Sequence, residues 1–485
     1  MIAKQSGIKR PRFVVIAEEL EDQIRSGGFV PGDRAPSLRR LKRREGVSLT
    51  TVQAAYHLLE DRGYLEARPR SGYFVRYPVS ETVPQPRSIR GVTKPARVTT
   101  TGLLESVIAS FTGVPLTQLG AATPSPDHLP TARLSALLGR TARIHPELSA
   151  SYEFPPGNLR LRRAVARRAA TYGCSVRPED VLTTVGTMEA LNLSLRAVAR
   201  GGDAVAIESP TYFGILQMIE SLSMRAFEIP THPGLGMDLD FLEGALRRRR
   251  VKACIVMANC HNPLGYVMTD ERKRHLADLA ARYRVPVIED DIFGDLAYTP
   301  DRPNTVKSFD RSGWVILCSS VSKTLAPGLR IGWVFSDRFS GPILKLKFVN
   351  TVATPSLQQM AVAELLDSGG YDRHLHRLRR TLRAQVEGVA DAIHRRFPAG
   401  TRTTRPAGGY VLWIEMPRRV RSLLVYREAI RRGIALIPGE VFSVRGRFRN
   451  YMRVSCGHPV SPALLGAIAE IGQIAHRQSS GRLTS

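Results

Sequence analysis

The spacing of apolar residues near the start of the chain predicts three short helices. In RFVVIAEELEDQIRSGGF, apolar side chains recur at nearly helical spacing from Val15 to Ile24, and two glycines follow. A second helix is expected after Ser37 in PGDRAPSLRRLKRREGV, and a third after Ser48 in VSLTTVQAAYHLLEDRGYL. A serine at the N-cap accepts a hydrogen bond from a free backbone N–H and so favours a helix start. Gly63 is expected to end the third helix.

The next apolar pattern predicts a β-hairpin. YLEARPRSGYFVR reads as two short strands on either side of residues 68–72. The order helix, helix, turn, helix and hairpin is that of a winged helix-turn-helix, so residues 1–77 are expected to bind double-stranded DNA. The third helix would enter the major groove, and the hairpin tip would lie along the phosphates.

Basic and hydroxyl side chains lie where such a unit would meet DNA. Arginine and lysine neutralise phosphates, and short hydroxyls at the start of a helix can contact bases or phosphates. The expected DNA-binding residues are Arg39, Arg40, Lys42, Arg43, Arg44, Ser48, Thr50, Thr51, Arg68 and Arg70. The alternative is a solvated basic helix face beside an ordinary hairpin. The whole order of elements favours DNA binding over that alternative.

Residues 78–115 differ from both neighbouring stretches. PVSETVPQPRSIRGVTKPARVTTT is rich in Pro, Ser, Thr and Arg and has no sustained period, which indicates a linker of moderate stiffness. In residues 116–485, short β-rich runs alternate with helical patterns, so a mostly parallel sheet covered by helices is expected. From about residue 345 the pattern is helical, and GGYVLWIEM and YMRVSC then predict a smaller α/β subdomain.

Composition limits the class of protein. The 485 residues are 43% hydrophobic and 23% charged, which is typical of a globular protein of about three units. The five cysteines form no CxxC pair, which argues against a disulfide framework or a zinc site and fits a reducing cytosol. There is no apolar run of membrane-spanning length and no signal-peptide pattern at the start, so a cytoplasmic protein without a membrane segment is expected.

The formal net charge is +27, from 70 Lys and Arg against 43 Asp and Glu. Such an excess suits a polyanionic partner. Arginine greatly outnumbers lysine, however, and an Arg- and Ala-rich composition raises the charge even without such a partner. Charge alone therefore leaves the question of nucleic-acid binding open.

Polar residues follow the ends of the β-rich runs DVLTTVG, DAVAIES, ACIVMAN, VPVIEDD and WVILCSS. Ligands of open parallel sheets bind at the carboxyl ends of the strands. In run order, the residues there are Thr187 and Met188, then Tyr212, then Asn262, then Asp290, and finally Ser320, Ser322, Lys323 and Arg330. A helix start, an aromatic ring, an amide, a carboxylate and an amine at one edge predict a site for pyridoxal 5'-phosphate.

Each of these groups has a chemical role toward that cofactor. A lysine amine forms a Schiff base with the aldehyde, and a nearby cation and an apolar site keep the amine nucleophilic. A carboxylate beside the pyridine nitrogen keeps that nitrogen protonated. An arginine and serine hydroxyls hold the phosphate. Each residue alone has a simpler explanation, such as a surface lysine or a core aromatic, and it is their order together that favours the cofactor.

The N-terminal stretch resembles the DNA-binding domain of GntR-type regulators. The signature is PGDRAPSLRRL followed by VSLTTVQAAYHLLEDRGYLEARPRSGYFV. The family usually has arginine just after the serine that opens the third helix, and this chain has Leu49. The resemblance therefore implies DNA binding, but without one common DNA contact of the family and so without its usual operator preference.

From about residue 120 to 475 the chain resembles fold type I aminotransferases. The matching stretches are YEFPPGNLRLRRAVA, TTVGTMEALNL, ESPTYFG, NCHNPLG, EDDIFGDL and SSVSKTLAPGLRIGW. Joined to a GntR-type winged helix, this arrangement resembles the MocR subfamily of bacterial regulators. The resemblance implies cofactor roles for the residues named above. It also implies that Tyr152 reaches the cofactor phosphate of a second subunit in a homodimer, and that Arg453 binds the carboxylate of a substrate or effector.

The chain departs from the aminotransferase pattern just after Asp290. A tyrosine is usual there, and this chain has Ile292 and Phe293. The loss of that hydroxyl favours a transcription regulator that senses an amino acid, an amine or the cofactor itself with little or no turnover. Two alternatives stay open: a working aminotransferase with an accessory DNA-binding domain, and a basic nucleic-acid-associated protein whose second domain is only a dimerisation scaffold.

Overall fold

The computed structural model describes residues 11–25, 28, 29, 32–68, 71–75, 84–88, 91, 94–98, 102–110 and 116–481. The N-terminal part forms the predicted three helices and hairpin. These are α1 (Arg12–Arg25), α2 (Leu38–Glu45), α3 (Leu49–Asp61), β1 (Leu65–Arg68) and β2 (Gly72–Val75). The hairpin is antiparallel and places Leu65 opposite Val75.

Local chemistry explains why these helices begin where they do. The Ser37 hydroxyl accepts a hydrogen bond from the backbone N–H of Arg40, and the Ser48 hydroxyl accepts one from Thr51. Both serines therefore cap the helices that follow them, as predicted. Apolar side chains of all three helices and the hairpin form a core of their own: Ile16, Leu20, Leu41, Val52, Leu59, Leu65 and Val75 are among its buried members.

The central feature of the larger part is a mixed sheet with the order β3-β7-β6-β9-β10-β11-β12-β5, with β8 paired to β7. Pairs among β7, β6, β9, β10 and β11 are parallel, whereas β12 is antiparallel to both of its neighbours. The strands are β3 (Ala96–Arg97), β5 (Val181–Thr184), β6 (Ala204–Ser209), β7 (Arg225–His232), β8 (Gly236–Met237), β9 (Ala253–Val256), β10 (Val287–Asp290), β11 (Val315–Ser320) and β12 (Gly332–Phe335). The predicted mostly parallel sheet is confirmed.

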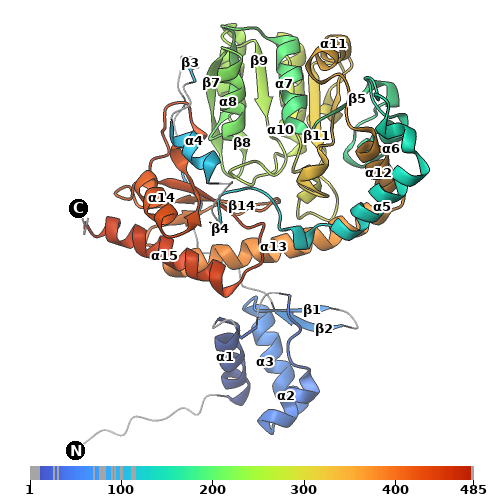
Figure 1. The fold of residues 1–485 in the computed structure, drawn as a ribbon. Helices are drawn as coiled ribbons and strands as arrows, with labels where there is room; N and C mark the ends of the chain where they lie inside the picture. The colour runs from blue at the N-terminus through green and yellow to red at the C-terminus, as the bar shows by residue number, and fades with distance from the viewer. Residues whose placement is uncertain are drawn as a thin grey trace, which may run out of the picture.

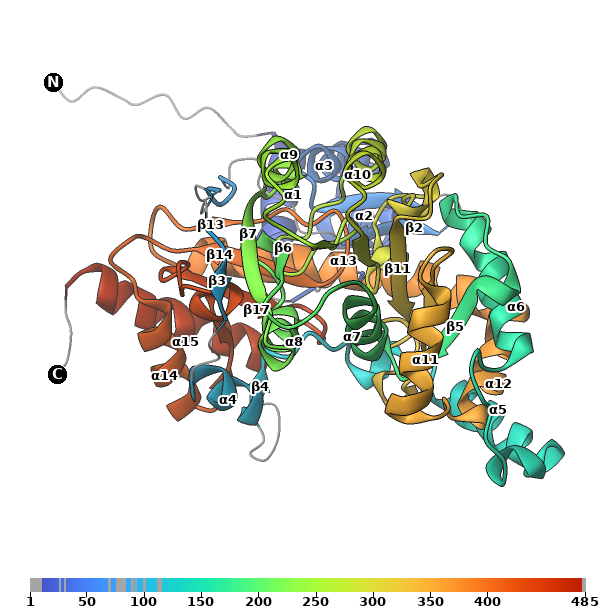
Figure 2. The same ribbon diagram turned by 90° about the horizontal axis from the view of Figure 1, so that it is seen from above.

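Helices cover both faces of this sheet (Figure 2). In this view α7 (Thr187–Val198) and α8 (Phe213–Ser221) lie on one face, and α9 (Leu239–Arg247) and α10 (Asp270–Tyr283) lie on the other. Beyond β5, α12 (Ser356–Asp367) packs against α5 (Thr131–Ile144) and α6 (Leu159–Ala169). The all-buried strands β6 and β11 match this coverage, because a sheet covered on both faces needs apolar side chains on both.

Two elements lie inside the stretch that was expected to be a linker. β3 adds an antiparallel edge strand to β7, and α4 (Gly102–Ala109) buries Leu104 and Val107 in the core of the larger part. A two-residue strand and an eight-residue helix are too short to show a period in the sequence. Residues 96–97 and 102–109 therefore belong structurally with the larger part.

The chain ends in a smaller subdomain around a four-stranded antiparallel sheet, with the order β13-β14-β17-β16. A further parallel pair joins β15 to β4. The elements are β4 (Thr117–Gln118), α13 (Gly370–Arg396), β13 (Arg402–Thr403), β14 (Val411–Glu415), α14 (Ser422–Arg431), β15 (Ile434–Ala435), β16 (Ile437–Pro438), β17 (Tyr451–Ser455) and α15 (Pro462–Ser479). The preceding helix α11 (Ser340–Thr351) packs instead against α7 and β5 of the large sheet layer. The predicted smaller α/β subdomain is confirmed.

The 27-residue helix α13 runs along the base of the larger part (Figure 1). The N-terminal unit lies below it, with the hairpin nearest to the larger part and α2 farthest away. No helix among the described residues is long and apolar enough to cross a membrane.

Candidate functional site

A pocket of about 270 Å³ lies at the carboxyl ends of the parallel strands. Nine residues selected from the sequence for cofactor or effector binding line it: Thr187, Met188, Tyr212, Asn262, Asp290, Ser322, Lys323, Arg330 and Arg453. They come from separate segments of the chain, so the fold brings them together. Lys323 and Arg330 follow β11, Asp290 ends β10, and Arg453 lies on β17 of the smaller subdomain.

Lys323 projects its amine into this pocket. The Nζ atom donates a hydrogen bond to the backbone oxygen of Ala122, at 2.7 Å. Burial in the pocket lowers the pKa of Lys323 to about 8, the positive charge of Arg453 adds to this, and the carboxylate of Asp290 opposes it. A lysine with such a pKa supplies far more neutral amine near neutral pH than a surface lysine does, which is what attack on an aldehyde requires.

Asp290 is a buried carboxyl group with few partners. Its Oδ1 atom accepts a hydrogen bond from the backbone N–H of Ile292 at 3.2 Å. Burial raises the pKa of Asp290 to about 7, and the N–H of Ile292 opposes this shift. A protonated ring nitrogen beside the carboxylate would favour its charged form. The position therefore suits a ligand that carries a positive charge at this end.

Arg453 is fully buried, at 1% exposure. Its guanidinium donates to Oδ1 of Asn262 at 3.1 Å and to the backbone oxygen of Gly120. The Nε–H has no hydrogen-bond partner among the described residues, and burial lowers the pKa of Arg453 to about 10. A buried cation with an unused donor is costly unless a ligand compensates it, and a carboxylate would do so.

The start of α7 forms a cradle for an anion. Gly186 precedes the helix with φ of 80°, and a Cβ atom there would lie 2.6 Å from the guanidinium of Arg330. Only glycine fits both constraints, so the Arg330 guanidinium can approach this turn, where its Nη2 atom donates to the backbone oxygen of Val185 at 2.9 Å. The first N–H groups of a helix have no partner within the helix and can bind an anion. The Thr187 hydroxyl at this point is buried and has no hydrogen-bond partner among the described residues. These donors suit a phosphate, and the donor set as a whole fits pyridoxal phosphate.

Two of the residues expected at the cofactor do not line the pocket. Ser320 is buried behind it, where its hydroxyl accepts a hydrogen bond from the backbone N–H of Ser322 at 3.2 Å. Tyr152 is 70% exposed and its ring lies against Phe154, with 5.7 Å between centroids. Ser320 thus supports the cradle from behind, and Tyr152 points to the surface of this chain.

Several residues of the pocket were missed in the sequence. The largest omission is the segment 121–123, where the backbone oxygen of Ala122 faces Lys323. Backbone carbonyls carry no residue-type signal, so no sequence pattern could have identified them. The remaining lining residues that were not selected are Phe213, Met257, Ile292, Phe293 and Pro327.

Phe293 lies where the aminotransferase pattern has a tyrosine. The centroid of its ring is 5.8 Å from Nζ of Lys323, and the ring packs edge-on against Tyr410 with 5.5 Å between centroids. The hydroxyl of Tyr410 is directed to the backbone oxygen of Ala122 at 3.0 Å. The side chain at 293 therefore supplies an apolar wall and no hydrogen-bond donor.

The basic side chains of α2 are all solvent-exposed: Arg39, Arg40, Lys42, Arg43 and Arg44. Arg44 is partly neutralised, because its Nε atom lies 2.8 Å from Glu45. At the start of α3, the hydroxyl of Ser48 lies 2.7 Å from that of Thr50 and 2.8 Å from that of Thr51. Exposed cations beside a cluster of hydroxyls suit the DNA backbone.

The hairpin faces the larger part of the molecule. Arg68 packs over the ring of Phe74 at 4.1 Å, and Arg70 lies outside the described residues. Glu66 and Arg68 line a cleft of about 420 Å³ together with Arg380 and Arg383 of α13. The hairpin and helix α13 of the larger part therefore line the same cleft.

Comparisons with known proteins agree with this two-part structure. Residues 14–75 match the family described as bacterial regulatory proteins, gntR family, and residues 139–463 match aminotransferase class I and II. The chain is similar to the HTH-type transcriptional regulators YjiR and YdcR of Escherichia coli strain K12. Each is 35% identical over 96% of this chain, and the matches span 99% and 98% of those proteins.

The structure is similar to that of LysN, an α-aminoadipate aminotransferase from Thermus thermophilus complexed with N-(5'-phosphopyridoxyl)-L-leucine. The TM-score is 0.72 at 26% identity, over 79% of this chain and 96% of LysN. The regulator family and the aminotransferase family together cover most of the chain. The chain therefore belongs to the MocR subfamily of GntR-type transcriptional regulators, and it is a DNA-binding regulator whose aminotransferase-like domain takes pyridoxal phosphate.

Proposed function

We propose that this regulator senses an amino acid or amine in its cofactor pocket and changes its DNA binding in response. The observation that carries the proposal is the buried guanidinium of Arg453, whose Nε–H has no protein partner among the described residues and which lines the same pocket as Lys323. An amino acid would bring a carboxylate to Arg453 and an amine to the cofactor end of the pocket. An unused donor of this kind favours a ligand with a carboxylate.

Pyridoxal phosphate supplies an aldehyde that couples to amines and a ring that withdraws electrons. Each residue proposed to hold the cofactor would contact a different group of it. Lys323 offers its amine, Asp290 offers a carboxylate to a ring nitrogen, and Asn262 offers an amide to a ring hydroxyl. Tyr212 offers a ring face for stacking. The proposed phosphate-binding residues are Thr187, Met188, Ser322 and Arg330, which line the pocket. Ser320, which was expected to bind the phosphate as well, would act only through its hydrogen bond to the backbone of Ser322.

We also propose that the functional unit is a homodimer. Tyr152, Phe154, Phe348 and Val349 are 70, 55, 51 and 74% exposed. Phe154 lies between Tyr152 and Phe348, with ring centroids 5.7 and 6.2 Å away. An exposed aromatic cluster of this size marks an interface. Tyr152 on such an interface would reach the cofactor phosphate of the partner subunit.

A second candidate function is turnover as an aminotransferase. The grouping of Lys323, Asp290 and Arg453 in one pocket is compatible with turnover, because these groups suit both sensing and catalysis. The apolar wall at Phe293 favours sensing, since no side-chain donor comes from that position. Steady production of a keto acid from an amino acid, with a second keto acid as acceptor, would support the enzymatic alternative.

The deciding experiment combines absorbance and DNA binding on the same protein. A panel of amino acids and amines is added to the cofactor-loaded regulator, and the compound that changes the visible absorbance is then tested in a DNA-binding titration. We expect that compound to change the affinity by about 5- to 150-fold, the usual size of a coupling between sites. Arg453→Gln should keep the cofactor and basal DNA binding but lose the response to carboxylates. Unchanged affinity and footprint with a compound that alters the spectrum would refute sensing.

A further inference from the structure

Helix α3 of the N-terminal unit begins with an apolar side chain that lies outside the core. Leu49 is the first residue of this helix and is 38% exposed. Among the described residues of the N-terminal unit, it is the only large apolar side chain that is exposed. Val52, Tyr56 and Leu59 of the same helix are buried in the core of the unit. Packing within the unit therefore does not explain a leucine at position 49.

The first turn of α3 fixes the direction in which Leu49 projects. The hydroxyl of Ser48 accepts a hydrogen bond from the backbone N–H of Thr51 at 3.1 Å, which caps the helix. The same hydroxyl lies 2.7 Å from that of Thr50. The polar side chains on both sides of Leu49 are therefore bonded to each other, and the backbone between them is held in place.

Leu49 also begins the outward row of α3. Gln53 and His57 are exposed, and residues four positions apart lie on the same face of a helix. In a helix-turn-helix protein, the residues near the start of the second helix of the motif contact the base edges in the major groove. Of this row, Leu49 is therefore the side chain nearest to the end of the helix that meets the bases.

A leucine can recognise one kind of group in the major groove. Its side chain has no hydrogen-bond donor or acceptor, so it reads none of the polar atoms on the base edges. Thymine alone presents a methyl group in this groove, at C5. Contact between that methyl group and a leucine removes apolar surface of both from water. A polar base atom covered by the leucine would instead lose its water without gaining a partner.

We infer that Leu49 reads the C5 methyl group of a thymine in the operator. Leu49 is then a specificity-determining residue, whereas the exposed cations of α2 bind phosphates of any sequence. The inference rests on the DNA binding of the winged helix and is independent of the proposed sensing of an effector.

The first test identifies the base. Binding sites are selected from a library of random duplexes with the full-length, cofactor-loaded protein and with its Leu49→Arg variant. The native protein should enrich thymine at one position where the variant enriches guanine, because O6 and N7 of guanine accept hydrogen bonds from arginine. Arg39→Ala should weaken binding but keep the preference for thymine, since a phosphate contact carries no sequence information. Identical selected sequences for the native protein and Leu49→Arg overturn the inference, as does a change confined to positions where the native protein does not select thymine.

The second test removes only the methyl group from the DNA. Deoxyuridine in place of the selected thymine should lower the affinity of the native protein about fourfold, which corresponds to the burial of one methyl-sized group. 5-Bromodeoxyuridine, which has bromine in place of the methyl group, should restore the affinity. Fluorescence titrations measure all three duplexes with the same protein, so this comparison needs no variant. Equal affinity for the thymine and deoxyuridine duplexes overturns the inference.

The third test assigns the methyl contact to Leu49. In Leu49→Ala the thymine and deoxyuridine duplexes should bind nearly alike, because the shortened side chain no longer reaches the methyl group. Thr50→Ser is the matched control, since it removes the neighbouring exposed methyl group and keeps the hydroxyl beside Ser48. The deoxyuridine penalty should persist in this control. A penalty that persists in Leu49→Ala, or one that disappears in Thr50→Ser, overturns the inference.

Discussion

The basic side chains of α2 and those of the cofactor pocket differ in their exposure to water. Arg39, Arg40 and Lys42 are exposed, whereas Arg453 is 1% exposed and its pKa is lowered by burial. An exposed cation costs nothing to keep charged and acts on any nearby phosphate, subject to salt. A buried cation is costly and acts on one ligand group at a fixed place. One chain thus uses the same residue type for a general and for a selective interaction.

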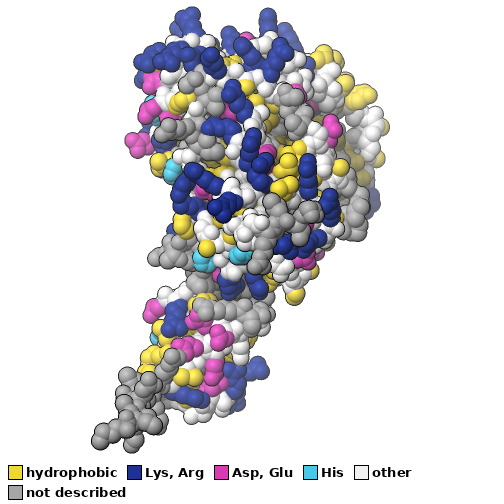
Figure 3. Space-filling model, turned by 90° about the vertical axis from the view of Figure 1, so that its left-hand side faces the viewer, with side chains coloured by type: hydrophobic (Ala, Val, Ile, Leu, Met, Phe, Trp, Pro, Cys, Tyr) yellow, Lys and Arg dark blue, Asp and Glu magenta, His cyan; other side chains and the backbone are white. Residues whose placement is uncertain are grey.

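The distribution of charge sharpens this contrast. Residues 1–77 carry 15 Lys and Arg against 9 Asp and Glu, which is only +6 of the total of +27. On the face drawn in Figure 3, Lys and Arg are spread over the large domain, while acidic and basic side chains are mixed on the N-terminal unit. The overall charge therefore does not identify the DNA-binding region. Its identification rests on the basic run of α2 and on the order of elements.

The largest effect is expected from Lys323→Ala. This change removes the amine that joins the cofactor to the chain, so the visible absorbance of the linked cofactor should disappear. Lys252→Ala, an exposed lysine in the same domain, is the matched control and should leave the spectrum unchanged. Absorbance spectroscopy of the purified, cofactor-loaded proteins measures both. An unaltered spectrum in Lys323→Ala would contradict the assigned role.

The next effect is the salt dependence of DNA affinity, which depends on the exposed basic side chains of α2. Binding of several α2 cations to phosphates releases counterions, so DNA affinity should fall about a thousandfold or more between 50 and 200 mM salt if a dimer makes six or more such contacts. Arg39→Ala should reduce the slope of log affinity against log salt by about 1 for each phosphate that the arginine neutralises. Fluorescence titrations at several salt concentrations give the slope, and Arg418→Ala serves as the control. A slope that Arg39→Ala leaves unchanged would remove this residue from the DNA interface.

The sequence predicted the positions of side chains better than it predicted their contacts with the backbone. The caps at Ser37 and Ser48 and the residues at the strand ends were predictable, because capping and strand-end placement depend on local chemistry and on one rule of sheet topology. The hydrogen bonds from Lys323 to Ala122 and from Arg453 to Gly120 were not predictable, since they end on backbone oxygens.

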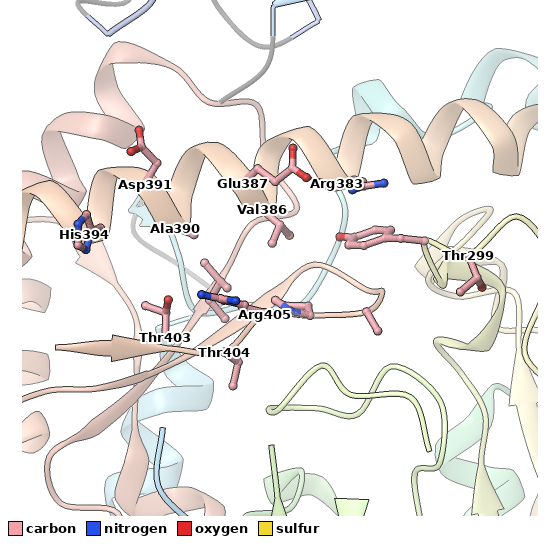
Figure 4. A pocket seen from close by; sticks show the side chains of 14 residues that line it. Thr299, Arg383, Val386, Glu387, Ala390, Asp391, His394, Thr403, Thr404 and Arg405 are labelled. Carbon is pink, nitrogen blue, oxygen red and sulfur yellow. Dashed lines mark hydrogen bonds and ion pairs between the residues drawn. The ribbon is translucent and has the colours of Figure 1, made fainter. Parts of the chain in front are cut away.

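The elements missed in the sequence have a similar explanation. β3 and α4 are too short to show periodicity, and their assignment depends on packing against a distant strand and core. A further cavity, between α13 and the segment after β13, combines positions more than a hundred residues apart, Thr299 and Arg405 among them (Figure 4). No local pattern marks such a cavity, because it exists only where the tertiary packing leaves space.

The third effect is a pH dependence of cofactor capture. The pKa of Lys323 is lowered to about 8, so the neutral amine is scarce below this pH and predominates above it. Asp290, with a pKa raised to about 7, loses its charge as the pH falls and then no longer favours a protonated ring nitrogen. The rate of capture should therefore rise between about pH 6 and 8 and level off above about 9. Rapid-mixing absorbance measures it. Nα-acetyl-lysine, with an ordinary amine pKa of about 10.4, should still be rising there, and a flat protein profile would contradict the shifted pKa.

The smallest effect is expected from Phe293→Tyr, which restores the hydroxyl that the aminotransferase pattern has. The ring of Phe293 is 5.8 Å from Nζ of Lys323, so a hydroxyl at its end would lie within the cofactor pocket. A donor directed at the oxygen of the cofactor ring favours the charged form of that oxygen, so the pH midpoint of the visible absorbance should fall by roughly one unit. Phe309→Tyr, away from the pocket, is the control. A midpoint that stays the same or rises would show that Phe293 does not set the electronic state of the cofactor. A fall in the midpoint accompanied by new keto-acid production would show that the apolar wall is what separates sensing from turnover in this domain.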